Sequence, residues 1–423
     1  MTEKNAIAPF ARPLYVMLKP AGAHCNLACE YCYYLEKRNL YAGGTDCLMS
    51  ESLLEKFTRE YIESQTTQEV LFTWHGGEPL LRPLSFYQKA VSLQKRYAGG
   101  RQIDNALQTN GTLLTDDWCR FLKENRWLVG VSIDGPQKYH DAFRKSRSGH
   151  PSWQQTLKGI EKLNRYGVEW NAMAVVNSIN AEHTAEIYDF FKKSGTDFLQ
   201  FTPIVERILP HSDGRHLATP CDSAPLTPSS ITPEQWGRFL CELFDLWVQN
   251  DVGRFFVQIF DATLANWCGV EPGLCTLSAS CGHAAVMEHN GDVYSCDHFV
   301  FPEYKLGNIN QNTIIRMLYG KRQSEFGLKK HSFLPLKCKK CEFLFACHGE
   351  CPKNRFATTS TGEQGLNYLC DGYREFFCHV KPYMDFMRDE LNAQRPPSNV
   401  MQAIKQGMLP RPAFPEKGKN TVQ

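Results

Sequence analysis

Short apolar runs alternate with amphipathic stretches from Leu14 to about Pro203. The apolar runs are typical of strands, whereas between them apolar residues recur every three or four positions, as on one face of a helix. The first helix is predicted to begin after Ser50, which would cap it, with Met49 as an apolar staple before the cap. The predicted strands are Leu14–Leu18, Val70–Trp74, Asn105–Gln108, Trp127–Ile133, Glu169–Val176 and Phe198–Phe201.

This alternation of strands and helices predicts a parallel sheet with right-handed crossover connections. The sheet can be open or closed into a barrel, and the hydrophobic pattern does not choose between the two. The predicted helices between the strands cover Leu53–Tyr61, Phe86–Tyr97, Trp118–Glu124, Trp153–Tyr166 and Ala181–Lys193.

The pattern changes twice after the predicted sheet. Residues 206–232 are rich in Pro, Ser, Thr and Gly, which indicates a loop or linker, and a helix is predicted over Pro233–Asn250. From Cys275 the strands shorten and cysteines accumulate, as in a small domain that metal stabilises. We expect four parts: a sheet domain over 1–232, a helical connector over 233–274, a cysteine-rich domain over 275–379, and a C-terminal helix with a loosely held, Pro-rich tail over 380–423.

Charge and hydropathy exclude several classes of protein. The 47 Lys and Arg residues balance 45 Asp and Glu residues, which gives no support for a nucleic-acid or acidic-membrane partner. No apolar run approaches the roughly 18 residues that a membrane span needs. The N-terminal residues contain no apolar segment of the kind found in secretion signals. The sequence therefore predicts a cytoplasmic protein with neither nucleic acid nor membrane as partner.

The 17 cysteines are the informative part of the composition. A reducing compartment keeps thiols from pairing stably, so clustered cysteines indicate metal binding rather than disulfides. Cys378 and the five scattered cysteines are expected to be small buried apolar residues. Three cysteines lie at 25, 29 and 32, nine lie between 275 and 378, and the scattered ones are Cys47, Cys119, Cys221, Cys241 and Cys268.

Four unusual loops follow the first four predicted strands, where parallel α/β folds place their functional sites. One loop holds the Cys-x3-Cys-x2-Cys triplet, which is one thiolate short of a complete four-cysteine site and leaves a metal position open to a small molecule. A structural zinc completed by His24 or by a distant cysteine is the alternative. The loops are His24–Cys32, His75–Pro79, Gln108–Gly111 and Ser132–Pro136.

The glycine pair Gly76-Gly77 of the second loop also has two interpretations. Without side chains, the pair lets a ligand approach the backbone closely. A tight turn from strand to helix explains the same two residues equally well.

The C-terminal cysteines divide into two sets of four, each enough for one cluster. The ending Cys-x3-Cys-Pro is similar to two-cluster ferredoxins, where the last cysteine of the run ligates the other cluster. We therefore assign Cys351 to the first set. Two zinc sites with the same ligands are the alternative. The first set is Cys275, Cys281, Cys296 and Cys351; the second is Cys338, Cys341, Cys347 and Cys370.

The triplet followed by Gly-Gly-Glu-Pro in a βα repeat resembles the radical S-adenosylmethionine superfamily. The resemblance implies a partial (β/α)6 barrel of parallel strands, with a [4Fe–4S] cluster held by Cys25, Cys29 and Cys32. It also implies that the methionine part of S-adenosylmethionine chelates the open iron. By position, the residues that would contact this cofactor are Tyr31 through its backbone, Gly76, Gly77 and Glu78 at the amine, Ser132 and Arg144 at the carboxylate, and Leu199 near the adenosine.

The second half of the chain resembles the SPASM extension, which holds two auxiliary [4Fe–4S] clusters in enzymes that modify peptides. Within that group the chain is similar to the anaerobic sulfatase-maturating enzymes, from the Cys triplet through Ser295–His298 to Leu366–Cys370. The resemblance implies a radical oxidase that converts a Cys or Ser side chain in an unfolded sulfatase segment to Cα-formylglycine. Asp297 would be the proton acceptor, because the family has its base at this position.

The same resemblance implies two partners. One is a sulfatase polypeptide with a Cys/Ser-x-Pro-x-Arg motif, and the other is an electron donor such as ferredoxin or flavodoxin. Two alternatives to the function stay open. One is a SPASM-type enzyme that forms a thioether or carbon–carbon crosslink, and the other is a non-enzymatic zinc or electron-transfer protein.

Overall fold

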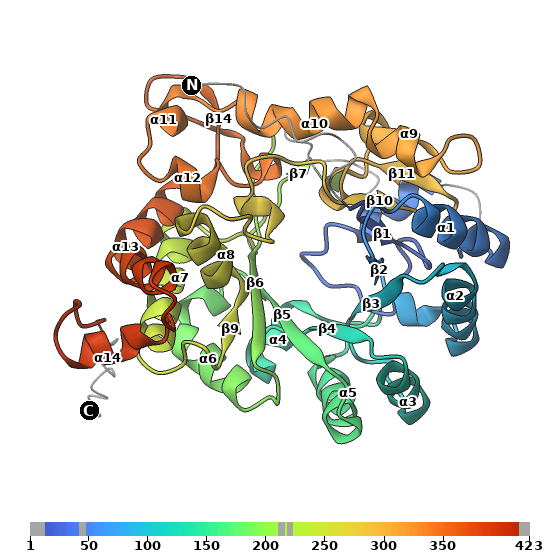
Figure 1. Cartoon of the computed structure of the whole chain (residues 1–423), viewed down its shortest axis with the longest axis horizontal. Coiled ribbons are helices and arrows are strands. Elements are labelled where there is room, and N and C mark those ends of the chain that lie inside the picture. The colour runs from blue at the N-terminus through green and yellow to red at the C-terminus, as the bar shows by residue number, and fades with distance from the viewer. Residues whose placement is uncertain (1–12, 42–47, 210–215, 218–222, 414–423) are drawn as a thin grey trace.

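A computed structural model describes residues 13–41, 48–209, 216–217 and 223–413 of the chain. Its described strands include ten that form one sheet in the order β12-β11-β10-β1-β2-β3-β4-β5-β6-β9, with β1 to β6 parallel and side by side in chain order (Figure 1). The six predicted strands are confirmed. The first six strands are Val16–Leu18 (β1), Glu69–Trp74 (β2), Gln102–Thr109 (β3), Leu128–Ser132 (β4), Trp170–Val176 (β5) and Phe198–Pro203 (β6).

The barrel that these strands form is partial. Strand β1 pairs with β10 (Ala285–Met287) and β6 pairs with β9 (Phe256–Val257), so the two edges of the six-stranded arc bond to later parts of the chain instead of to each other. Strands β11 (Asp292–Tyr294) and β12 (Lys305–Asn308) continue antiparallel from β10. The cysteine-rich segment therefore extends the barrel's own sheet.

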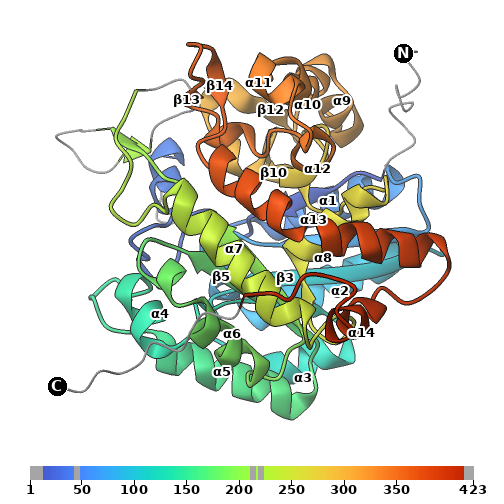
Figure 2. The same cartoon turned by 90° about the vertical axis from the view of Figure 1, so that its left-hand side faces the viewer.

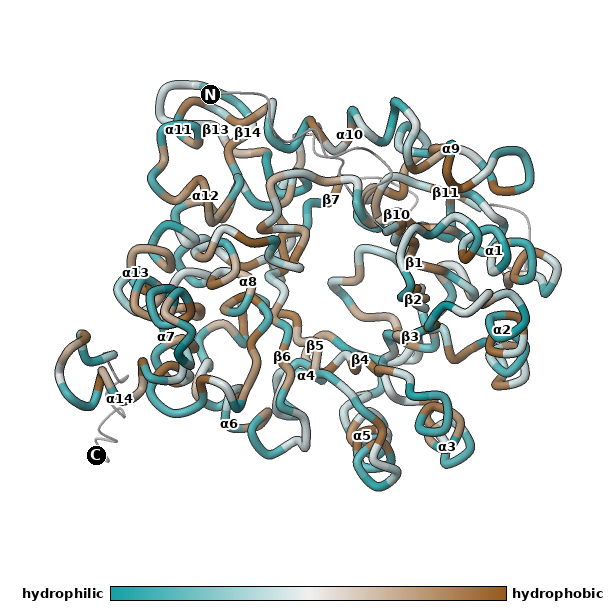
Figure 3. Tube along the Cα trace, in the orientation of Figure 1, coloured by the Kyte–Doolittle hydropathy of each residue, from teal (hydrophilic) through white to brown (hydrophobic). Residues whose placement is uncertain are grey.

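Amphipathic helices cover the outer face of the arc, and Figure 3 shows both apolar and polar turns along them. The predicted cap is confirmed, because Ser50 Oγ accepts a hydrogen bond from the N–H of Leu53 at 3.2 Å, and Met49 is fully buried beside it. The helices up to residue 267 are Glu51–Glu63 (α1), Leu84–Tyr97 (α2), Asp116–Glu124 (α3), Gln137–Phe143 (α4), Trp153–Tyr166 (α5), Thr184–Lys192 (α6), Pro233–Val248 (α7) and Gln258–Trp267 (α8).

The longest C-terminal helix joins the two halves of the molecule. Helix α13 lies alongside α7 (Figure 2), where Asp245 Oδ1 and His379 Nε2 are 2.6 Å apart. The predicted domain boundary at 379/380 falls inside α13, so a division there would cut one continuous helix. The other C-terminal helices are Ile314–Leu318 (α9), Lys321–Ser332 (α10), Leu336–Lys339 (α11), Leu344–Cys347 (α12), Cys370–Asn392 (α13) and Asn399–Lys405 (α14).

Two predictions about irregular segments need correction. The described part of the segment 206–232 contains a short hairpin of β7 (Ile208–Leu209) and β8 (His216–Leu217), and the described residues 223–232 form a loop as predicted. The segment from 394 to 413 is not a loosely held tail, because α14 buries Val400 and Ile404 in the core. Its apolar residues recur at helical spacing, which the many prolines around it obscured. Residues 414–423 lie outside the described part of the chain, and so do Cys47 and Cys221.

In the described part of the chain, no helix combines the length and the apolar composition needed to cross a membrane. A further small hairpin joins β13 (Ala357–Thr358) to β14 (Gln364–Leu366).

Candidate active site

The alternation of side chains along the strands decides which residues face the inside of the barrel. Leu18 and Trp74 pair in register and are fully buried in the core against the outer helices. Successive side chains of a strand point to opposite faces. The next residues, Lys19 and His75, therefore point inward at the carboxyl ends of β1 and β2, and Lys19 Nζ lies 3.2 Å from His75 Nδ1.

The cysteine triplet lies in the loop after β1, and its three thiols are brought together. Burial raises the pKa of Cys25 to about 12, and the neighbouring Glu78, Cys29 and Cys32 contribute to this rise. Burial likewise raises the pKa of Cys29 to about 12. Buried thiols of this kind stay neutral unless a positive group compensates their charge, and iron ions supply such a charge. The donor set thus fits an iron–sulfur cluster with one open position.

The Gly-Gly-Glu-Pro loop packs directly on the cysteine loop. The N–H of Gly77 donates to Gly22 O at 2.8 Å, and the N–H of Glu78 donates to His24 O at 2.7 Å. A Cβ built on Gly77 would lie only 2.0 Å from His24 O. Gly77 must therefore lack a side chain so that the cysteine loop can pack against it. This packing requires glycine here even without a ligand.

The carboxylate of Glu78 accepts three hydrogen bonds from other residues of the protein. It accepts hydrogen bonds from the Leu80 N–H at 3.0 Å, the Thr109 hydroxyl at 2.7 Å and the Asn110 N–H at 2.8 Å. Burial raises its pKa to about 7, although these donors act in the opposite direction. Glu78 thus ties the loop after β2 to the loop after β3, a role that its predicted cofactor contact did not include.

Arg144 and Tyr31 meet at one buried carboxylate. The Arg144 guanidinium donates to both oxygens of Asp134, at 2.9 and 3.1 Å, and the Tyr31 hydroxyl donates to the same carboxylate. Asp134 also accepts the N–H of Val175 at 2.9 Å. Two of the guanidinium nitrogens of Arg144 are therefore engaged inside the protein, and Asp134 links the cysteine loop to β5.

The two predicted cofactor contacts on β4 and β6, Ser132 and Leu199, have side chains on opposite faces of the sheet. Ser132 shares the inner face and accepts a hydrogen bond from Gln108 at 2.9 Å. Leu199 pairs in register with Ala172, and its side chain is buried in the core against the outer helices. The residue of β6 that shares a face with Ser132 is Gln200, one position further on, because Ser132 pairs with Met173 and Met173 with Gln200. Gln200 was missed in the sequence.

The first set of four C-terminal cysteines is brought together beside the barrel. Burial raises the pKa of Cys351, and the charges of Glu350, Cys296, Cys281 and Cys275 raise it further. Cys351 lies in the sequence among members of the second set, yet its thiol neighbours belong to the first. The chain thus crosses over between the two sets.

The second set lines one cavity with Phe343 and Tyr373. Burial raises the pKa of Cys347 to about 12, and Cys370 and Cys338 contribute; burial also raises the pKa of Cys370 to about 11, with Cys338 and Cys341 contributing. Among the described residues no group of three or more His, Cys, Asp or Glu side chains is placed to hold a single metal ion. A four-iron cluster is larger than one ion, and four soft thiolates are its usual donors.

The remaining described cysteines are only partly as predicted. Cys119 is fully buried, whereas Cys241 and Cys268 are half-buried and Cys378 is exposed. The expectation of a buried apolar role is therefore wrong for Cys378.

Asp297 directly follows Cys296 and is held from two sides. Lys19 Nζ lies 2.6 Å from Asp297 Oδ1, and the Tyr33 hydroxyl donates to Oδ2. Burial alone would raise the pKa of Asp297, but the charge of Lys19 and its hydrogen bond to the carboxylate hold this pKa below its ordinary value. The carboxylate is therefore ionised at neutral pH. Nothing in the sequence singles out Lys19 or Tyr33 as partners of Asp297.

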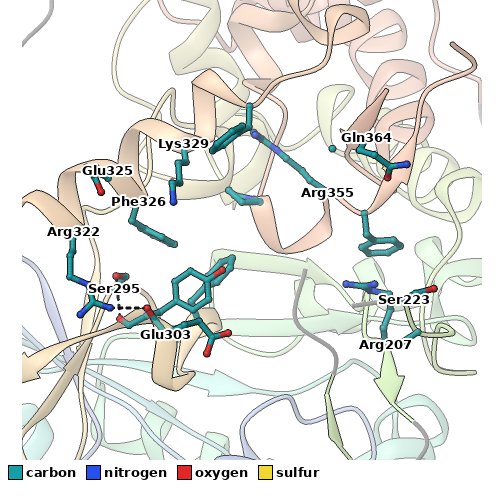
Figure 4. Close-up of a pocket in the computed structure, with 17 residues that line it drawn as sticks. Arg207, Ser223, Ser295, Glu303, Arg322, Glu325, Phe326, Lys329, Arg355 and Gln364 are labelled. Carbon is teal, nitrogen blue, oxygen red and sulfur yellow. Dashed lines mark hydrogen bonds between the residues drawn. The ribbon is translucent and has the colours of Figure 1, made fainter. Parts of the chain in front are cut away.

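An open cavity of about 860 Å³ lies between the cysteine-rich domain and the loop after β6. Figure 4 shows Lys329 and Arg355 across the opening from Ser295 and Glu303. Aromatic side chains line it as well, and the buried Arg207 guanidinium lies 4.1 Å from the centre of the Phe356 ring. Ser295 and Phe299, which line the cavity, lie on either side of Asp297 in the sequence.

This fold and this site define a radical S-adenosylmethionine enzyme with an auxiliary iron–sulfur domain. The Radical SAM superfamily model matches residues 20–191, and the model of an iron–sulfur cluster-binding domain, SPASM, matches residues 280–342. The serine-type anaerobic sulfatase-maturating enzyme of Bacteroides thetaiotaomicron is 63% identical, over 95% of this chain and 98% of that protein. The cysteine-type enzyme of Clostridium perfringens is 32% identical, over 88% and 97%.

A solved structure agrees with these relatives. Native anSMEcpe with bound AdoMet and Cp18Cys peptide aligns with a TM-score of 0.79 at 30% identity, over 90% of this chain and 100% of that one. The chain therefore belongs to the family of anaerobic sulfatase-maturating enzymes. It is an enzyme of sulfatase maturation, and its cofactors are [4Fe–4S] clusters and S-adenosylmethionine. Family membership rules out the non-enzymatic alternative and disfavours the crosslinking one.

Proposed function

We propose that the enzyme oxidises a serine side chain of an unfolded sulfatase segment to Cα-formylglycine. The observation that carries the proposal is the position of Asp297 beside the open three-thiol site. Its ionised carboxylate pairs with Lys19 at the carboxyl end of β1 and accepts a hydrogen bond from Tyr33, the residue directly after Cys32. Serine is preferred over cysteine because the 63% identical relative is named a serine-type enzyme, whereas the cysteine-type relative from Clostridium perfringens is 32% identical.

Cys25, Cys29 and Cys32 would hold the catalytic cluster. When bound, the cluster and S-adenosylmethionine supply a 5′-deoxyadenosyl radical through one-electron cleavage of the sulfonium. Since the carboxylate of Glu78 is occupied, the backbone of Gly76 to Glu78 would meet the methionine amine, with Tyr31 contributing its backbone. Ser132 and the remaining N–H groups of Arg144 would bind the methionine carboxylate. Gln200, in place of the Leu199 side chain, would face the adenosine.

The two further sets of thiols would hold auxiliary clusters. Cys275, Cys281, Cys296 and Cys351 form one site, and Cys338, Cys341, Cys347 and Cys370 form the other. Each site anchors a segment with little core of its own, so that the clusters stabilise the second domain as well as carrying electrons. The proposed division into barrel, helical connector and cluster domain follows these ligand sets.

Asp297 would accept the hydroxyl proton of the substrate serine. Removing one hydrogen atom from Cβ, one electron and this proton converts the CH₂OH group into the aldehyde of formylglycine. The ion pair with Lys19 keeps Asp297 ionised before the reaction, as a general base requires. The cavity that opens at Ser295 and Phe299 is the proposed route for the sulfatase segment with its Cys/Ser-x-Pro-x-Arg motif.

A small electron carrier of the ferredoxin or flavodoxin type would supply the reducing electron. The rim of the second auxiliary site supports an acidic partner, because Lys337, Lys339 and Lys340 are exposed there beside the exposed side chains of Leu336 and Phe345. Such clusters and free thiols need a reducing compartment, from which we propose the cytoplasm as the site of action.

Two matched sulfatase peptides test the substrate preference. They differ only in Ser or Cys at the target position and are incubated anaerobically with the reconstituted enzyme, S-adenosylmethionine and a reductant. Mass spectrometry should find more aldehyde from the serine peptide. Faster turnover of the cysteine peptide would overturn the serine preference. An intramolecular crosslink in place of an aldehyde would instead favour the crosslinking alternative.

A further inference from the structure

Lys19 is a charged side chain in the interior of the protein. Its side chain is fully buried at the carboxyl end of β1. A buried ammonium is costly unless it is paired and hydrogen-bonded. The pairing comes from Asp297, 2.6 Å away, and the Tyr34 ring, whose centre lies 4.1 Å from Lys19 Nζ, adds a cation–π contact.

The third contact of Lys19 is with His75, an uncharged hydrogen-bond acceptor that orients the ammonium group. His75 Nδ1 accepts the N–H of Gly76 at 2.7 Å, so this nitrogen carries no proton and can also accept from Lys19 at 3.2 Å. Lys19 is thus held between a neutral acceptor on β2 and a carboxylate on the cluster domain.

The pair joins two parts of the molecule that are far apart in the sequence. Lys19 belongs to the first barrel strand, whereas Asp297 begins a short 3-10 helix, Asp297–Phe299, directly after a cysteine of the first auxiliary set. Tyr33, from the cysteine loop of the barrel, donates to the other oxygen of Asp297. Both oxygens of the carboxylate are therefore oriented by barrel residues.

We propose that Lys19 is a positioning residue that holds Asp297 at the barrel mouth, an inference that rests on the proposed role of Asp297 as proton acceptor. A carboxylate on a short turn has free side-chain torsions, and a charge-assisted hydrogen bond restricts them. Without the ammonium, the carboxylate can leave the geometry that proton transfer needs. Radical formation at the cysteine triplet does not need this contact.

The test compares two buried lysines. Lys19→Met removes the ammonium and keeps most of the side-chain volume, and Lys37→Met makes the same change at a buried lysine whose Nζ lies over the Phe301 ring. The readout is the ratio of formylglycine to 5′-deoxyadenosine, with iron content measured in parallel. Lys19→Met should lower this ratio about tenfold, the value of one hydrogen bond to a charged group. Lys37→Met should leave it unchanged, and an equal loss in both variants would overturn the proposal.

A double-mutant cycle separates positioning from a merely structural role. In the Asp297→Asn background, Lys19→Met should lower the ratio no further, because the group it orients is already gone. A further loss of the same size would overturn the proposal. If Lys19→Met alone loses iron, Lys19→Gln replaces it throughout, with the same outcomes expected. An unchanged ratio in Asp297→Asn would overturn the proposed base itself, whereas a loss in Asp297→Asn but not in Lys19→Met would overturn only this inference.

Discussion

Arg144 and Asp134 form a buried, bidentate salt bridge. Arg144 Nε lies 2.9 Å from one carboxylate oxygen and Nη2 lies 3.1 Å from the other. The same carboxylate receives the hydroxyl of Tyr31, which lies between two cysteines of the triplet. The pair therefore orients the loop that would carry the catalytic cluster, in addition to any contact Arg144 makes with the cofactor.

Asp134→Asn should destabilise the barrel and the catalytic cluster together. Breaking one side of a buried ion pair costs about 3–5 kcal/mol. Thermal unfolding under anaerobic conditions and iron content after reconstitution measure the two effects. Asp117→Asn is the control, because it breaks an ion pair with Arg120 that is exposed and contributes little. Equal stability of the two variants would contradict the role given to Asp134.

Gly77→Ala should displace the cysteine loop. A Cβ at this position would lie 2.0 Å from His24 O, a backbone atom that cannot move alone. We expect loss of the iron of one cluster, and no release of 5′-deoxyadenosine. Gly99→Ala is the control, since its Cβ would meet nothing closer than 3.8 Å and only its positive φ of 57° adds strain. Full radical formation by Gly77→Ala would show that the two loops can separate freely.

Much of this architecture could be predicted from the sequence, and the misses have physical causes. The six strands and the Ser50 cap follow from local patterns, and the crossing of Cys351 to the first set follows from its Cys-Pro context. The direction of the Leu199 side chain, towards the outer helices, could not be predicted by position alone, because a shift of one residue in a strand exchanges its two faces. The pairing of Lys19 with Asp297 could not be foreseen, since a lone lysine after a strand gives no local sign of a distant partner.

The stability of the protein should fall as the pH falls, in part because of His75. Burial and the charge of Lys19 lower its pKa to about 3, from 6.5 in the unfolded chain. Between pH 6.5 and pH 3, His75 binds a proton in the unfolded state but not in the folded state. The stability that is present above pH 6.5 is therefore lost progressively down to pH 3. The loss between pH 7.5 and 5.5 is on the order of 1 kcal/mol. Anaerobic melting curves should show a weaker pH dependence for His75→Gln, and an unchanged dependence would contradict a neutral, buried His75.

Cys351→Ala should remove the same cluster as Cys275→Ala, although Cys351 lies between Cys347 and Cys370 in the sequence. Each variant should hold about 8 irons per chain instead of about 12 after reconstitution. Electron paramagnetic resonance of the reduced proteins should lose the same signal in both. Cys378→Ala is the control, because this exposed cysteine belongs to neither set. A loss of different signals in the two variants would contradict the crossover.

The central claim is that the enzyme takes a hydrogen atom from the Cβ of a target serine, and an isotope-labelled peptide tests it most directly. A sulfatase peptide whose target serine carries two deuterium atoms on Cβ is incubated anaerobically with the reconstituted enzyme, S-adenosylmethionine and reductant. The 5′-deoxyadenosine released should contain deuterium in proportion to the aldehyde formed on the peptide. Aldehyde formed while 5′-deoxyadenosine stays free of deuterium would contradict the claim.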